Sequence, residues 1–192
     1  MSEKTPMSRS RVTGTALLVG ATSTVLVTAG ATNALAAGPV SAPLSVADCT
    51  AAVLEVDEVG RRTVDGTTHI DFEIVKLPPR TPYDDEACVM YGDLAAMYWG
   101  DSEGNPIGAP GVRDGAGGDP FALFPGEAAR LTVAKPDPDG RDPGECDPVE
   151  VAGVHLFFRN DEGAEYVPTR GADRICVDPA AGDSRFSPLT RP

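Results

Sequence analysis

Basic side chains are scarce in this chain of 192 residues, which has 16 lysine and arginine residues against 29 aspartate and glutamate residues. The formal net charge is −13 at pH 7, and the only lysines are Lys4, Lys76 and Lys135. Nucleic acids and anionic lipid surfaces are bound through basic patches, so this composition argues against both as partners. It is typical of a protein kept in solution by like charge, and a cation or a basic partner is the alternative.

Residues suited to catalysis are also few. The two histidines, His69 and His155, lie in segments of alternating apolar and polar residues, where a surface or rim position is more common than a general base. Ser102 is not surrounded by the Gly-x-Ser-x-Gly pattern of a nucleophile elbow. Acidic runs such as 84–86 are numerous, yet no glycosidase-type pair can be selected among them. We therefore expect no enzymatic activity and no cofactor, with a secreted hydrolase as the alternative.

Long amphipathic helices are absent from the pattern, and short strands take their place. Ile70, Phe72 and Ile74 alternate with polar residues, which is the period of a half-buried strand. Other expected strands, separated by turns rich in Gly, Pro, Asp and Asn, cover 52–56, 88–91, 94–99, 121–124, 129–133, 149–158, 165–167 and 175–177. This series predicts an all-β fold, and specifically an immunoglobulin-like antiparallel β-sandwich with two disulfides.

The N-terminal segment has the layout of a secretory signal peptide over residues 1–36. A basic start with Lys4, Arg9 and Arg11 precedes an apolar run over 15–27, and the segment closes on the small residues of 34–36. This layout predicts cleavage between Ala36 and Ala37 and an extracellular, secreted domain. The run is interrupted by Gly, Ser and Thr, whereas a spanning helix needs about 20 mostly apolar residues. We therefore expect no membrane insertion after cleavage; an uncleaved anchor is the alternative.

Three segments follow the expected cleavage position. Residues 37–48 are small residues and prolines, which predicts a flexible linker. The strand series and all four cysteines fall within 49–178, which predicts the β-sandwich domain. Residues 179–192 show no periodic pattern and are expected to be a disordered C-terminal tail.

The four cysteines are Cys49, Cys88, Cys146 and Cys176. An even number in an exported chain predicts two disulfides, and sequence alone allows three connectivities. We favour Cys49–Cys88 with Cys146–Cys176, and the other two pairings stay open. No C-x-x-C pair accompanies the histidines, so a zinc site is not expected.

Two further features suggest a ligand. The carboxylates Asp137, Asp139 and Asp142 lie around a glycine turn and are weak candidates for holding Ca²⁺, although Asp-Pro and Asp-Gly pairs also simply make turns. Tyr83, Phe157 or Trp99, if exposed, would form a platform for a sugar or a protein. A calcium-dependent binding module is therefore an alternative function.

The order of motifs resembles the actinobacterial family of exported four-cysteine domains of unknown function. The resemblance covers about 48–178 and rests on the four cysteines together with the pieces Tyr91-Gly92, Gly100–Pro106 and Phe124–Glu127. It departs at Gly92-Asp93, where a Gly-Tyr-Pro-like turn is more usual. It implies a β-sandwich and an exported protein, and it implies no activity and no functional residues.

Taken together, these patterns predict an exported, non-catalytic β-sandwich at the cell envelope or outside the cell. Its role would be binding or interaction. The expected partner is a protein or a cell-wall glycan whose identity the sequence leaves unknown.

Overall fold

The computed structural model describes residues 46–81, 86–139, 141, 146–178 and 184–192. The chain clusters into the units Met1–Ala42 and Pro43–Pro192, and every described residue belongs to the second. The expected signal peptide, with its cleavage position between Ala36 and Ala37, lies outside the described residues. Within them, no helix has the length and apolar character needed to cross a membrane.

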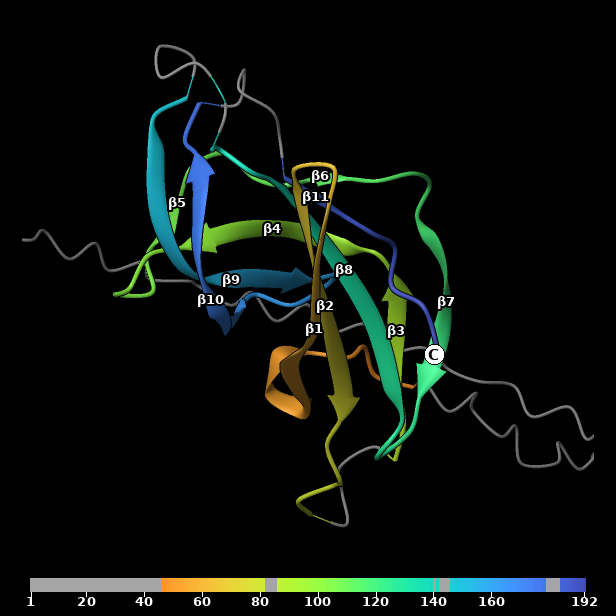
Figure 1. Ribbon diagram of the computed structural model, residues 1–192. Coiled ribbons are helices and arrows are strands. Elements are labelled where there is room, and N and C mark those ends of the chain that lie inside the picture. The colour runs from red at the N-terminus through yellow and green to blue at the C-terminus, as the bar shows by residue number, and fades with distance from the viewer. Residues whose placement is uncertain (1–45, 82–85, 140, 142–145, 179–183) are drawn as a thin grey trace, which may run out of the picture. The chain divides into compact units, whose positions relative to one another are not determined.

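The described residues are all-β apart from the short 3-10 helix η1 (Ala51–Val53). The strands are β1 (Leu54–Val64), β2 (Thr67–Lys76), β3 (Cys88–Gly92), β4 (Leu94–Gly100), β5 (Pro106–Ile107), β6 (Val112–Arg113), β7 (Gly118–Leu123), β8 (Ala128–Pro136), β9 (Pro148–Phe158), β10 (Glu165–Cys176) and β11 (Arg185–Phe186). They form a five-stranded sheet in the order β1-β2-β8-β11-β6, a four-stranded sheet in the order β10-β9-β4-β5, and the pair β3-β7 (Figure 1). All pairs are antiparallel except β11 with β6.

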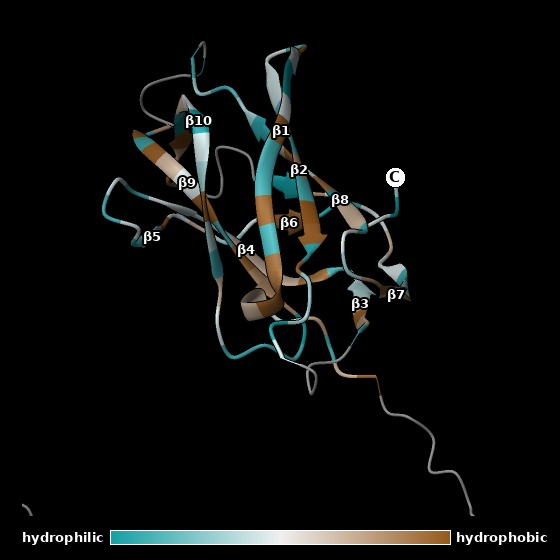
Figure 2. Ribbon diagram, turned by 90° about the horizontal axis from the view of Figure 1, so that it is seen from below, coloured by the Kyte–Doolittle hydropathy of each residue, from teal (hydrophilic) through white to brown (hydrophobic). Residues whose placement is uncertain are grey.

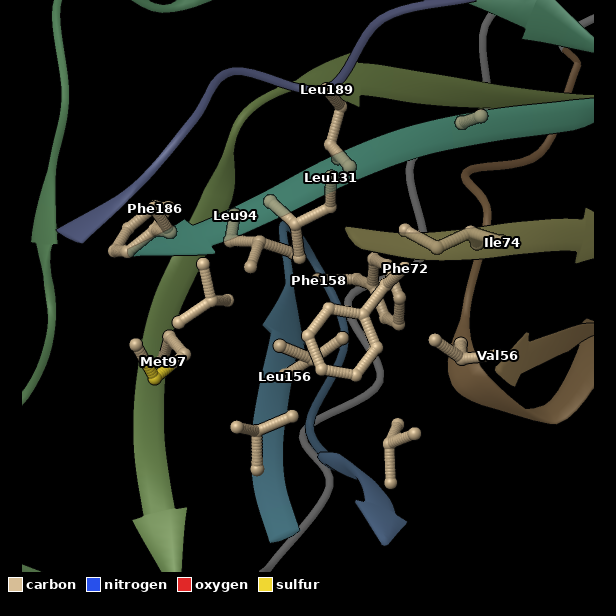
Figure 3. Close-up of a cluster of buried hydrophobic side chains, with 14 of the residues drawn as sticks. Val56, Phe72, Ile74, Leu94, Met97, Leu131, Leu156, Phe158, Phe186 and Leu189 are labelled. Carbon is tan, nitrogen blue, oxygen red and sulfur yellow. The ribbon is translucent and has the colours of Figure 1, made fainter. Parts of the chain in front are cut away.

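Alternation along the strands builds the core, as the sequence pattern predicts. Ile70, Phe72 and Ile74 of β2 are 0% exposed, and they pair in register with Val133, Leu131 and Ala129 of β8. Hydrophobic and hydrophilic bands alternate visibly along β1 and β9 (Figure 2). From the four-stranded sheet, side chains of β4 and β9 meet those of β2 and β8 (Figure 3). Each fully buried large apolar side chain contributes about 1.5–3 kcal/mol relative to exposure.

A β-bulge at Val59 changes which residues of β1 face the core. In a regular strand Glu58 and Arg61 would point to opposite faces. The register instead pairs Glu58 with Phe72 and, after a shift of one residue, Arg61 with Ile70. Both partners are core residues, so the bulge turns Glu58 and Arg61 to the same inner side. A wider register shift in β10, between Pro168 and Asp173, faces this end of β1.

Two disulfides cross-link the chain, one between Cys49 and Cys88 and one between Cys146 and Cys176. This is the sequential pairing among the three that the sequence allows. The first bridge fastens the segment before β1 to β3, and the second closes the outer ends of β9 and β10. Stable disulfides suggest an oxidising environment.

The C-terminal segment is part of the fold, so the prediction of a disordered tail over 179–192 is wrong for 184–192. Strand β11 pairs with β8 and β6, and Phe186 and Leu189 are 4% and 2% exposed. The hydroxyl of Ser184 accepts a hydrogen bond of 2.9 Å from Nε1 of buried Trp99. Two apolar side chains in a short segment create no periodic pattern, which is why tertiary docking was not predicted. Residues 179–183 lie outside the described part.

Candidate functional site

A cleft of about 530 Å³ opens where the start of β4 meets β6, β11 and the turn after β9. We call it the arginine cleft. It is lined by Leu94, Ala95, Gly111, Arg113, Arg159, Asn160 and Phe186. Leu94 and Phe186 are 3% and 4% exposed, so they form a base with little accessible apolar surface, whereas the two arginine side chains are 41% and 49% exposed. A concave surface with an apolar base and a few convergent polar groups is the usual form of a ligand site.

Asp93 lies at the centre of the charged wall of this cleft. It is the single residue between β3 and β4, at the corner where the chain passes from one sheet to another. Gly92 makes the corner possible, because a Cβ atom there would lie 2.1 Å from the backbone carbon of Gly118. The backbones therefore approach closely, and the Asp93 side chain is held 7% exposed beneath the cleft. The resemblance noted from the sequence departs at this dipeptide.

Two arginines from distant parts of the chain share the Asp93 carboxylate. Arg159 donates from Nε to Oδ1 at 2.8 Å and from Nη2 to Oδ2 at 2.9 Å. Arg113 donates from Nη1 to the same Oδ2. Gly117 packs against this group, since a Cβ atom there would lie 3.1 Å from Asp93 Oδ2. The three side chains carry one negative and two positive charges, which leaves the cleft wall with a net charge of +1.

Asn160 forms the neighbouring wall and is held in a left-handed conformation with φ of 59°. Asparagine adopts this region more readily than most residues. Its amide Nδ2 donates to Oδ2 of Asp48 at 2.8 Å and to the hydroxyl of Tyr91 at 3.2 Å. Because the carboxylate of Asp48 can only accept, Nδ2 must face it, and Oδ1 is left as an acceptor.

A second charged group lies between the edge strands of the two larger sheets, and we call it the closed cluster. It contains Glu58 and Arg61 of β1, Lys135 of β8 and Asp173 of β10, with the Glu58, Lys135 and Asp173 side chains 3–6% exposed. Two positive and two negative charges cancel. The 26% exposed Arg61 side chain bridges both carboxylates, with bonds of 2.8 and 2.9 Å to Asp173 and of 2.9 and 3.0 Å to Glu58.

The remaining groups of the closed cluster are also satisfied. Lys135 Nζ lies 3.7 Å from Asp173 and donates to the backbone oxygen of Arg174 at 2.9 Å. The backbone N–H of Arg170, in the irregular part of β10, donates to Glu58 at 2.8 Å. Burial by itself raises the pKa of Glu58, but the hydrogen bonds from Arg61 and from the Arg170 backbone outweigh it and the pKa falls below 4.5. The hydrogen bond to Glu58, followed by that to Asp173, raises the pKa of Arg61.

Of the three predicted calcium ligands, Asp137 and Asp139 lie among the described residues. Asp137 Oδ1 accepts the backbone N–H of Asp139 at 2.9 Å, which is an Asx turn, and Asp139 pairs with Arg174 at 3.0 Å. Asp142 lies outside the described residues. Among those that are described, no three His, Cys, Asp or Glu side chains gather in a metal-holding arrangement. The calcium site stays a prediction.

Trp99 is 1% exposed and part of the core, so it does not meet the condition of exposure that an aromatic platform requires. Phe157 is half-buried on the outer side of β9, edge-on to Tyr98 at 5.8 Å between ring centroids, and Tyr83 lies outside the described residues. His155 packs on Tyr166 at 4.9 Å, and His69 is half-buried on β2. Ser102 is exposed in a turn. Among the described residues of this group, Phe157 and His155 share β9, whereas Trp99, His69 and Ser102 lie on other elements.

The residues of the arginine cleft were missed from the sequence. Asp93 is separated from Arg113 by 20 positions and from Arg159 by 66. Arginines near turns are common, and no motif links these three. One signal was present, because Gly92-Asp93 is the point at which the family-like pattern changes.

The fold and cleft define an all-β, disulfide-bridged domain with a small, largely polar cleft. The chain belongs to the family described as Domain of unknown function (DUF4232), whose model matches residues 81–186. The match includes Asp93, both cleft arginines and the Cys146–Cys176 bridge, and it excludes β1 and β2. No curated protein and no solved structure matches the chain.

Proposed function

We propose that this chain is an exported, non-catalytic binding domain that holds its ligand in the arginine cleft. The observation that carries the proposal is the cleft itself: two half-exposed guanidiniums and an asparagine oxygen beside an apolar base. Such a surface supplies hydrogen bonds and shape to a ligand. It contains no serine, cysteine or histidine among its lining residues, so it offers no evident nucleophile or general base.

Export is supported by the signal-peptide layout of residues 1–36 and by the two disulfides. Within the same proposal, the fold is immunoglobulin-like and the source is actinobacterial, as the sequence resemblance implies. An experimental structure with the two larger sheets aligned at about −30° would support the immunoglobulin-like assignment.

Export is tested by recovering a C-terminally tagged full-length protein from supernatant, wall and membrane fractions. The expected species starts at Ala37 and is lighter than its reduced form by four hydrogen atoms, two for each disulfide. A full-length species held in the membrane would contradict cleavage and leave the N-terminus as an anchor.

Binding is tested without assuming the ligand chemistry. Isotope-labelled protein is mixed with a library of saccharides, peptides and small organic molecules, and backbone amide shifts are recorded by NMR. We expect hits that shift residues 93–95, 111–113 and 159–160 and that Ala95→Trp abolishes, because Ala95 is exposed in the cleft. Ser102→Trp, an exposed turn residue elsewhere, is the control and keeps the binding.

Two results would contradict the proposed function. Ligands that bind Ala95→Trp as well as the unchanged protein would place the binding site elsewhere. Turnover of any library member, surviving replacement of His69 and His155, would favour the hydrolase.

A further inference from the structure

We propose that the arginine cleft binds the free C-terminal carboxylate of a peptide. This inference rests on the proposed function, because it names the ligand class of the same cleft. Three features of the cleft support it: its charge, its unused donors and its remaining walls.

The first feature is the local charge. One carboxylate, Asp93, is shared by two guanidiniums, so within the part of the chain that the structure describes one of these two positive charges has no ion-pair partner of its own. Of the other nearby acids, Asp114 lies 3.7 Å from Arg185, whereas Asp48 accepts only from the neutral amide of Asn160 and keeps its charge on the far side of that residue. In a chain with a formal net charge of −13, a half-exposed cationic wall is unusual. A ligand with a single negative charge would neutralise it.

The second feature is the geometry of the donors. Arg159 uses Nε and Nη2 on Asp93, and Arg113 uses Nη1. Within the described residues, the other N–H groups of both guanidiniums make no hydrogen bond. Asp93 holds both planar groups in place, so little side-chain freedom is lost when they bind a ligand. Planar guanidinium donors match the two oxygens of a carboxylate.

The third feature separates a peptide end from other carboxylates. Asn160 lines the same cleft, and its Oδ1 is left as an acceptor because Nδ2 is held by Asp48 and Tyr91. A peptide C-terminus places an amide N–H next to its carboxylate and can satisfy both kinds of group. The apolar side chains of the lining are exposed Ala95 and the nearly buried Leu94 and Phe186, which suit a small terminal side chain. Acidic sugars carry hydroxyls in place of that side chain, and the base is poorly suited to them.

The test uses a pool of N-acetylated peptides of random sequence with free C-termini, the same pool amidated, and glucuronic acid. Binding is followed by amide shifts of residues 93–95, 111–113 and 159–160. We expect the free-acid pool to shift these residues and the amidated pool to bind about tenfold more weakly, which corresponds to about 1.4 kcal/mol.

Two substitutions of Ala95 separate charge from shape without touching the arginines. Ala95 sits at the register shift at the start of β4, where its side chain is exposed in the cleft. Ala95→Glu places a competing carboxylate there, and Ala95→Gln has nearly the same shape without the charge. We expect Ala95→Glu to bind the free-acid pool about tenfold more weakly than Ala95→Gln. Ser102→Glu adds the same charge in a distant turn and leaves binding unchanged.

Three results would overturn the inference: equal binding of the free-acid and amidated pools, equal binding by Ala95→Glu and Ala95→Gln, or cleft shifts from glucuronic acid alone. If the unbiased library still yields hits that Ala95→Trp abolishes, the proposed function stands and only the ligand class is wrong. If neither the peptide pools nor the library shifts the cleft residues, both fail.

Discussion

The closed cluster and the arginine cleft both pair buried carboxylates with cations, but they differ in the balance of charge. In the closed cluster, Glu58 and Asp173 meet Arg61 and Lys135, so the charges balance and every carboxylate is bonded between strands. In the cleft, Asp93 meets Arg113 and Arg159, so one positive charge is in excess and half-exposed. Balanced, inaccessible charge joins two sheets, whereas unbalanced, accessible charge is available to a ligand.

Their positions sharpen the contrast. The closed cluster connects the outer strands of the two larger sheets, β1 and β10, and depends on irregular register in both. The cleft lies where the chain changes sheets between β3 and β4, next to the docked C-terminal segment. The family match includes the cleft residues and excludes the β1 half of the closed cluster.

The largest effect is expected from Asp173→Ala in the closed cluster. It leaves Lys135, whose side chain is 6% exposed, and Arg61 without their shared carboxylate. Removing one partner of a buried pair costs about 3–5 kcal/mol. Urea unfolding measures the loss. Asp139→Ala removes an acid that is 74% exposed and paired with Arg174, and its expected cost is about 0–1 kcal/mol. Similar losses for both variants would show that the closed cluster is not stabilising.

Removing each disulfide in turn compares the two regions by ligand binding as well as by stability. Replacing either pair of cysteines with alanine should cost about 3.5–4 kcal/mol in the chain-entropy model, for separations of 39 and 30 residues. Only loss of Cys49–Cys88 should also weaken ligand binding. That bridge fastens the segment containing Asp48, which holds Asn160 at the cleft.

Unfolding and cleft binding are measured on both double variants, with binding assayed well below the transition. Loss of Cys146–Cys176 serves as the control, because this bridge lies where β9 begins and β10 ends. Equal loss of binding in the two variants would contradict the separation of the clusters.

The next effect concerns pH. The pKa of Glu58 is lowered on folding, so its stabilisation is present above about 4.5 and is lost as the pH falls through the folded-state value. Glu58→Gln should flatten this acid dependence and, because bonds to a charged group are lost, cost about 1.5–3 kcal/mol at neutral pH. Thermal melts from acidic to neutral pH measure both.

Glu165 provides a control of opposite sign. Burial raises its pKa, so folding is disfavoured as the pH rises and this group ionises. Glu165→Gln should therefore improve stability at neutral relative to acidic pH. The same direction of change in both glutamine variants would contradict the assigned shifts.

The smallest effect on stability is expected in the cleft. Arg113→Gln and Arg159→Gln each leave Asp93 with one guanidinium, and the side chains are 41% and 49% exposed. Each change should cost about 0–1 kcal/mol of unfolding free energy while weakening ligand binding. The double variant leaves the buried Asp93 carboxylate without either guanidinium. Its loss of unfolding free energy should exceed the sum of the two single losses. Additive losses in urea unfolding would show that the two arginines do not share the carboxylate.

The alternating strands were the most predictable part of this fold. The pattern of 68–74 predicts β2, which runs Thr67–Lys76, and the run 149–158 predicts β9 almost to its bounds. The later part of β1 was not predicted, because Glu58, Arg61 and Arg62 interrupt the apolar alternation. Here the polar residues at inner positions mark the closed cluster, and a local pattern cannot tell them from a turn.

The sequence by itself determined the all-β class, the positions of alternating strands such as β2 and β9 and the cysteines available for two disulfides, because a period of two and a residue count are local properties. Only the tertiary structure decided which charges meet. Arg61 and Asp173 are 112 positions apart and Asp93 and Arg159 are 66 apart, and each pair is joined by sheet order and bulges. Those depend on how the sheets pack over a common core, so the balance of charge in one cluster and its excess in the other exist only in the folded chain.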